Sequence, residues 1–215
     1  MNGNPDNDAL MLAGMLAARL CHDLAGPLGT VNGALELAEQ ADAEALALAR
    51  EATTDLAHRL RLYRAAWAEG AGPGSVAELA ALALGLAHRR VRLDITGLPG
   101  QARLRPELGR ILLNVLLLGA EGMPRGGTLA LHGDPEGDIA ALLAGPGAAW
   151  PAGTAQALAH PAAALSRLRD PSTTLPSRVL VASFIALLAA REGLRLRLLL
   201  GPGEAQAPPL LLTRA

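Results

Sequence analysis

Lysine is absent from this sequence of 215 residues, so its nineteen basic side chains are all arginine, against twenty acidic ones. The formal net charge is −1, and the sequence has no basic stripe of the kind that binds nucleic acid. The one cysteine, Cys21, excludes an internal disulfide and a cysteine-cluster metal site. We expect Cys21 to be a small buried side chain. The five histidines lack metal-ligand spacing, so no metal site is expected.

A signal peptide and a long apolar run are also missing. The N-terminal residues lack the positive charge and the apolar stretch that a signal peptide needs. The apolar segments at 111–118 and 179–190 are too short or too interrupted to span a bilayer. The residues are nevertheless 51% apolar, enough to bury one or two ordinary cores. These features predict a soluble, globular protein of the cytoplasm.

One histidine, His22, lies in a segment whose apolar residues recur every three or four positions. This spacing predicts an amphipathic helix, and at about 100° per residue it directs His22 away from Leu20 and Leu24. The outward face also holds small residues, several of them glycines. Each glycine in a helix interior destabilises the helix by about 1 kcal/mol relative to alanine. The close approach of another helix would explain why they are there. The apolar positions are Leu16, Leu20, Leu24, Leu28, Val31 and Leu35, and the small ones are Ala18, Gly26, Gly29 and Gly33. The spacing alone fits an ordinary surface histidine, and it also fits a phosphate-carrying nucleophile.

Residues 1–70 predict two helices, with a break near residues 40–42, where Asp42 is a suitable N-cap. Apolar positions in the second helix alternate steps of four and three, which indicates a seam for coiled-coil-like packing. The seam consists of Leu46, Ala49, Thr53, Leu56, Leu60, Tyr63 and Trp67. Two such helices cannot bury their apolar stripes alone, so we expect a homodimer in which two hairpins form a four-helix bundle. The alternative is that the seam packs on the C-terminal half of the same chain.

A glycine- and proline-rich segment at residues 70–74 prevents the second helix from continuing, and Ser75 can cap the helix that follows. We therefore divide the chain into a helical hairpin, residues 1–70, and a second domain, residues 75–215. Helical and strand patterns alternate in the second domain, which predicts layers of helices and a sheet. We expect helices up to about His88 and over 106–122 and 177–192, and strands at 91–95, 128–132, 139–143, 194–200 and 209–213.

The order His-Asp-x-x-x-Pro, which starts at His22, resembles the phospho-acceptor helix of two-component histidine kinases. More closely, residues 20–24, 27–29 and 32–37 resemble the opening helix of the ChpT-type histidine phosphotransferases of alphaproteobacteria. The resemblance covers essentially the whole chain. It implies an α+β fold, in which an N-terminal helical hairpin forms a dimeric four-helix bundle and is followed by a degenerate histidine-kinase ATPase-like α/β sandwich.

The resemblance to the kinase ATPase domain fails at the positions that bind nucleotide. The family's magnesium-holding asparagine falls on Leu118, and its adenine-binding aspartate falls on Leu143, which cannot accept the adenine amino proton. The glycines that wrap the triphosphate fall on or near Val179 and Val181, whose branched side chains obstruct close approach to the backbone. We therefore expect that the second domain binds no ATP and that the chain needs no cofactor.

The resemblance implies that His22 is the phospho-acceptor of a phosphorelay. In this reading it takes phosphate from the phosphoaspartate of a hybrid histidine kinase receiver domain and passes it to the receiver domains of response regulators. A neutral imidazole can attack phosphorus, and the receiver supplies the magnesium. Asp23 then orients His22 or contacts the receiver; the alternative is an ordinary solvated carboxylate.

Receiver docking is expected on the same helix, at Arg19, Gly26, Gly29, Asn32 and Gly33. Arg19 attracts phosphate or an acidic surface in this interpretation, and otherwise it is an ordinary solvated arginine. Two other functions stay open, a scaffold that binds receivers without carrying phosphate and an active histidine kinase. The substitutions in the nucleotide-binding boxes oppose the kinase.

Overall fold

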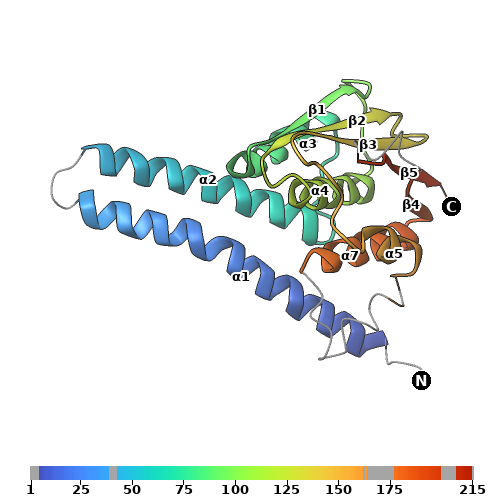
Figure 1. Ribbon diagram of the computed structural model, residues 1–215, viewed down its shortest axis with the longest axis horizontal. Helices are drawn as coiled ribbons and strands as arrows, with labels where there is room; N and C mark the ends of the chain where they lie inside the picture. The colour runs from blue at the N-terminus through green and yellow to red at the C-terminus, as the bar shows by residue number, and fades with distance from the viewer. Residues whose placement is uncertain (1–4, 39–42, 162, 164–176, 200–206, 215) are drawn as a thin grey trace.

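The structure is a computed structural model that describes residues 5–38, 43–161, 163, 177–199 and 207–214. Two long helices, α1 (Pro5–Ala38) and α2 (Ala43–Trp67), form an antiparallel hairpin that projects from an α/β part (Figure 1). The two helices predicted for the N-terminal region are confirmed, and the suggested N-cap Asp42 lies outside the described residues. None of the described helices has both the length and the apolar character needed to cross a membrane.

The predicted seam of α2 is divided between two environments. Near the end of the helix, Tyr63 is buried and stacks on Trp67, with ring centroids 4.7 Å apart, and the indole of Trp67 bonds to Asn114 in the α/β part. Of the other seam residues, Ala49 is buried, whereas Leu46 and Leu60 are 39% and 45% exposed. Tyr63 and Trp67 of the seam therefore pack on the chain's own α/β part, as the alternative interpretation held, whereas Leu46 and Leu60 are open to solvent.

Five strands form one mixed sheet in the order β1-β2-β3-β5-β4, in which β1 and β2 are parallel and the other neighbours are antiparallel. The elements of the α/β part are α3 (Val76–Ala83), the 3-10 helix η1 (Leu84–Arg89), β1 (Val91–Gly97), α4 (Pro106–Glu121), β2 (Gly127–Gly133), β3 (Ile139–Ala144), α5 (Thr154–Ala159), α7 (Ser177–Arg191), β4 (Leu194–Leu198) and β5 (Leu210–Arg214). Each expected strand and helix of this part lies within two residues of an observed one, and the predicted layers of helices and sheet are confirmed.

Helix α4 lies at the centre of the hydrophobic core. From Leu108 to Glu121, every residue except Arg110 is buried. A helix that is apolar on all sides is stable only when other elements cover all of it. Buried side chains of the sheet and of α7, such as Leu129 and Val181, belong to the same cluster. The end of α4 is thereby held rigidly, and this end faces α1.

The glycine-rich connection between α2 and α3 is packed closely against α4. A side chain at Gly72 would collide with the main-chain carbonyl of Pro106. The hydroxyl of Ser75 accepts a hydrogen bond of 3.2 Å from the amide of Glu78, so the predicted helix cap is confirmed. A short and tightly held segment therefore joins the hairpin to the α/β part.

Candidate functional site

His22 lies in the middle of α1, and its side chain is 88% exposed. The prediction that this histidine faces outward is confirmed. The neighbouring Cys21 is also exposed, so the expectation of a buried cysteine is wrong. The cover of α1 therefore leaves Cys21 and His22 exposed, and the face that carries the imidazole is open to a partner.

Four of the predicted docking residues follow the histidine along this open face. Gly26, Gly29 and Gly33 are exposed, and a β-carbon on any of them would meet nothing within 4 Å outside its own stretch of helix. Asn32 is exposed as well. Gly26 also borders a groove of about 680 Å³ that residues of α1 and α2 line. The structure thus brings these four residues together on one accessible surface.

Asp23 lies beside the imidazole and its side chain is only 14% exposed. Its Oδ1 is 3.2 Å from Nδ1 of His22, and its Oδ2 accepts a hydrogen bond of 2.7 Å from the hydroxyl of Tyr63 on α2. When Nδ1 carries the proton, it donates to Oδ1 and leaves the lone pair on Nε2. This burial does not fit an ordinary solvated carboxylate, whereas the geometry fits a group that orients the histidine.

Two opposing effects act on the pKa of Asp23. Burial raises it, whereas the hydrogen bonds from Tyr63 and His22 and the positive charges of Arg19 and Arg89 lower it. The second group of effects is stronger, so the pKa lies below its ordinary value of 3.8 and Asp23 is ionised at neutral pH. Burial, the hydrogen bond to Asp23 and the negative charge of Asp23 all raise the pKa of Tyr63, so its phenol stays protonated as a donor.

Arg19 lies one turn before Asp23, and its side chain is 8% exposed. Its Nε is 3.5 Å from Oδ2 of Asp23, and its Nη2 donates to Oε1 of Glu121 at the end of α4. Glu121 is buried as well. Arg19 is therefore part of an internal ion-pair network, and it is neither the solvated arginine nor the accessible docking side chain that the sequence indicated.

Tyr63 and Glu121 belong to this site although the sequence analysis did not assign them to it. The seam explains Tyr63 as a packing residue, and nothing local shows that its hydroxyl reaches a residue forty positions earlier. One signal was available: a buried tyrosine needs a hydrogen-bond partner that a leucine at the same position does not. Glu121 has no such signal, because its partner Arg19 lies 102 positions away.

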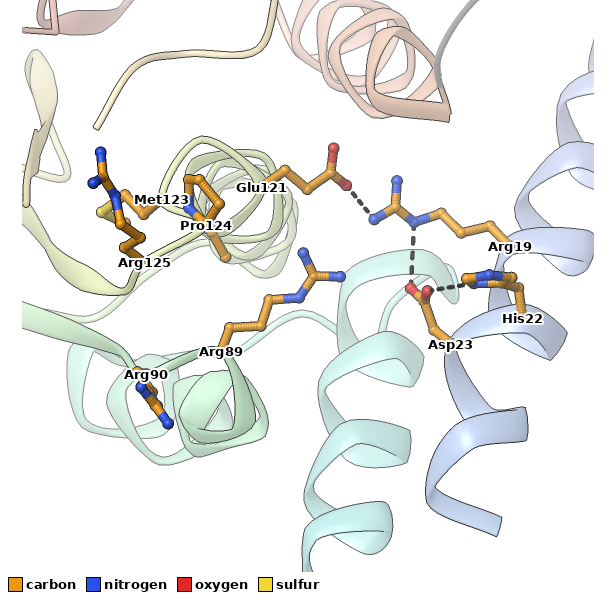
Figure 2. Close-up of a pocket in the computed structure, with 10 residues that line it drawn as sticks. Arg19, His22, Asp23, Arg89, Arg90, Glu121, Met123, Pro124 and Arg125 are labelled. Carbon is orange, nitrogen blue, oxygen red and sulfur yellow. Dashed lines mark hydrogen bonds and ion pairs between the residues drawn. The ribbon is translucent and has the colours of Figure 1, made fainter. Parts of the chain in front are cut away.

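A cleft of about 510 Å³ lies between α1 and the α/β part, directly beside His22 (Figure 2). Three further arginines line it, Arg89 at the end of η1, Arg90 after it, and Arg125 before β2. Figure 2 shows the guanidinium of Arg89 directed towards the space between Glu121 and Asp23. Arginine binds anionic oxygen atoms well, so the cleft combines a nucleophilic side chain with groups suited to phosphate or carboxylate.

Core side chains occupy the positions at which the kinase resemblance would place nucleotide-binding residues. Leu118 is fully buried in α4, and Leu143 of β3 is 7% exposed. Val181 of α7 is fully buried too, while the side chain of Val179 lies outside the described residues. The apolar side chains at these positions offer no atom that holds magnesium or accepts the adenine amino proton.

The chain resembles known phosphotransferases in both sequence and structure. Residues 76–201 match the model of a family described as histidine phosphotransferase C-terminal domain. The protein phosphotransferase ChpT of Brucella abortus (strain 2308) is 34% identical over 129 residues, which are 58% of this chain and 61% of that protein. The solved structure of a bacterial phosphotransferase is 22% identical with a TM-score of 0.71, and the match covers 96% of this chain and 97% of that one.

These likenesses agree with the expectations drawn from the sequence. The structural match confirms the α+β fold of N-terminal helices followed by a five-stranded α/β part. The family model begins at Val76, after the hairpin, so it identifies the family without testing the role of His22. The chain belongs to the ChpT-type histidine phosphotransferase family.

Proposed function

We propose that this protein carries phosphate in a two-component phosphorelay. Nε2 of His22 accepts a phosphoryl group from the phosphoaspartate of a receiver domain, which we expect to be that of a hybrid histidine kinase, and passes it to the receiver domains of response regulators. The observation that most directly supports this proposal is that His22 is 88% exposed while its Nδ1 lies 3.2 Å from a carboxylate oxygen of Asp23. The name of the Brucella relative, a protein phosphotransferase, supports the proposal.

The geometry fits the chemistry of this transfer. The lone pair of Nε2 forms a bond to phosphorus while the bond from phosphorus to the aspartyl oxygen breaks, and the electron pair of that bond stays on the carboxylate of the receiver. The imidazole then carries a positive charge, with Nδ1–H donating to Asp23, whose negative charge stabilises it. Transfer to the next receiver reverses these steps. The receiver supplies the magnesium, so this chain needs no cofactor of its own.

The open face of α1 supports receiver docking next to the histidine. Gly26, Gly29 and Gly33 present bare backbone, which a partner helix can approach closely, and Asn32 adds a hydrogen-bonding amide. Arg19 is left out of this surface because its side chain is buried in ion pairs.

Two alternative functions use parts of the same structure. An ATP-dependent kinase is opposed by the packed apolar side chains of Leu118, Leu143 and Val181, and we propose that the α/β part binds no ATP. A scaffold that binds receivers without carrying phosphate would use the docking face in the same way. Only the reactivity of His22 separates the scaffold from the carrier.

The hairpin also supports a homodimer, as a second proposal about the same protein. Leu28 and Leu35 of α1 are seven positions apart, so they share one helix face, and they are 47% and 46% exposed. Leu46 and Leu60 of α2 are exposed as well. A four-helix bundle formed by two hairpins would bury these side chains.

The carrier proposal is tested by giving the purified protein a radiolabelled, phosphorylated receiver domain and, in a parallel sample, labelled ATP with magnesium. We expect acid-labile, base-stable label from the receiver alone, lost in His22→Ala and kept in His58→Ala, a matched change on α2. Label from ATP alone would show a kinase. The absence of label from several receivers would favour the scaffold.

A further inference from the structure

Three helices contribute polar side chains to a network that ends at the imidazole of His22. Arg19 and Asp23 come from α1, Glu121 from α4 and Tyr63 from α2. The side chain of Glu121 is 5% exposed, and Tyr63 is 4% exposed. Figure 2 shows Glu121, Arg19, Asp23 and His22 joined in this order. Buried charges are costly unless each is paired, so the pairing constrains where these side chains lie.

The two carboxylate oxygens of Asp23 have different partners. Oδ2 accepts the hydrogen bond of 2.7 Å from Tyr63 and lies 3.5 Å from Nε of Arg19. Oδ1 faces Nδ1 of His22 at 3.2 Å. Because Oδ2 is held from two sides, rotation of the carboxylate is restricted, and Oδ1 stays directed at the imidazole.

An ionised carboxylate accepts hydrogen bonds and donates none, so the imidazole nitrogen that bonds to it carries the proton. In the neutral state, the bond from Nδ1–H to Oδ1 places the lone pair of His22 on Nε2. The other tautomer, with the proton on Nε2, has no lone pair there for attack on phosphorus. The fraction of molecules ready to react therefore depends on how firmly Asp23 is held.

We propose that Tyr63 and Glu121 are positioning residues for phosphoryl transfer, Tyr63 acting through Asp23 and Glu121 acting through Arg19, and that together they hold His22 in the Nδ1–H tautomer. The proposal rests on His22 being the phospho-acceptor. It also gives the α/β part a direct contribution to the site, because Glu121 is the last residue of its central helix.

Both residues act on Asp23 through Oδ2, Tyr63 directly and Glu121 through Arg19. Removal of the Tyr63 hydroxyl takes a partner from Oδ2 and frees the carboxylate to rotate. Removal of the charge on Glu121 leaves Arg19 more strongly attracted to Asp23, and a guanidinium that reaches Oδ1 displaces Nδ1–H from that oxygen. Either change allows the imidazole to populate the second tautomer.

The test uses the full chain labelled with ¹⁵N-histidine, with the signals of His22 assigned by comparison with His22→Gln. At alkaline pH, where imidazole is neutral, the ¹⁵N chemical shifts of the two ring nitrogens report the tautomer populations. The same samples are given phosphoramidate, a small donor that needs no docking surface, and the rate of phosphohistidine formation is measured. The test variants are Tyr63→Phe and Glu121→Gln.

Matched control variants make the same chemical changes away from the site. Thr53→Val removes a hydroxyl that bonds within α2 to the carbonyl of Ala49 at 2.7 Å. Glu69→Gln removes the charge of an exposed ion pair with Arg191. Both controls are expected to match the wild-type protein in tautomer population and in rate.

In Tyr63→Phe and Glu121→Gln we expect a shift towards the Nε2–H tautomer and phosphohistidine formation slowed about tenfold. The phenylalanine keeps the stacked ring, and Glu121→Gln is an independent variant if Tyr63→Phe does not fold. Unchanged tautomer populations in both variants would overturn the proposal. A tautomer shift in a protein whose His22 takes no phosphate from any donor would overturn the proposed function while confirming that the two residues hold the imidazole.

Discussion

The buried side chain of Asn114 in α4 is hydrogen-bonded to the indole of Trp67 in α2, with 3.1 Å between Oδ1 and Nε1. The amide nitrogen of Asn114 donates to the carbonyls of Ala66, at 2.8 Å, and Arg110, at 2.9 Å. One side chain therefore fixes the last turn of α2 against the centre of the core. It lies four positions before Leu118, on which the resemblance places the magnesium-holding asparagine of the kinases, and its role here is structural.

Asn114→Ala is expected to lower the free energy of unfolding by at least ~2 kcal/mol, because it leaves the buried indole N–H of Trp67 without this acceptor. Urea denaturation followed by circular dichroism measures the change. Asn32→Ala is the matched control on an exposed position and should change stability by less than about 0.5 kcal/mol. Equal effects of the two substitutions would contradict this account.

Gly29→Ala is expected to raise the free energy of unfolding by about 1 kcal/mol, because the helix has room for a β-carbon and alanine favours the helix. Gly29→Leu is expected to slow labelling of His22 by a phosphorylated receiver, since a long side chain holds the partner off the backbone. Labelling by phosphoramidate should not change. Thermal and urea denaturation and the two labelling rates check these outcomes.

Gly14 provides the control for the docking surface, since it lies on α1 with the same open space but eight positions before His22. Gly14→Ala should stabilise the protein by a similar amount, and Gly14→Leu should leave receiver labelling unchanged. If Gly14→Leu and Gly29→Leu slow the reaction equally, the docking surface is not where we place it.

The lowered pKa of Asp23 predicts how its contribution to stability depends on pH. Because the folded-state pKa lies below the ordinary value of 3.8, the contribution is complete above that value and is lost as the pH falls through the folded-state pKa. Asp23→Asn should therefore be less stable than the wild type at pH ~7, and the difference should shrink below pH ~4. Urea denaturation across this range provides the measurement, and a difference that is constant with pH would contradict it.

Glutamate at the exposed leucines of the hairpin is expected to separate the proposed dimer. Leu35→Glu and Leu60→Glu each place a charge where a four-helix bundle would bury an apolar side chain. Analytical ultracentrifugation should show a dimer for the wild type and a monomer for the double variant, with unchanged circular dichroism. Leu84→Glu, at a leucine of η1 that is 54% exposed, should remain dimeric. A monomeric wild type would refute the bundle.

The secondary structure was largely predictable because its signals are local. The apolar run of α4 marks a helix covered on all sides, and β3 is a short, uniformly apolar run that is typical of a strand in the core. Glycine and proline mark the connection after α2, where Ser75 caps the next helix as expected. Helix α5 was not predicted, because a segment of six residues is too short to show a helical periodicity.

The site was predictable only in part. The exposure of His22 follows from its position on α1, but the burial of Arg19 depends on Glu121, which arrives from another element. Helical periodicity describes one helix at a time and contains no information on which helix meets it. Cys21 shows the same limit, because the sequence does not reveal where the cover of α1 ends. The division of the α2 seam likewise depends on where the α/β part lies.

The distance along the chain between Arg19 and Glu121, 102 positions, has a consequence for the order in which the protein is assembled. Contacts between distant residues form late in folding, since a long loop must close before they can be made. During synthesis His22 emerges early, and Glu121, the last residue of α4, follows only after α2, α3, η1 and β1. A nascent or truncated chain that ends before Glu121 therefore contains the histidine without the ion pair beside it, and assembly of the site reports that α4 has reached α1.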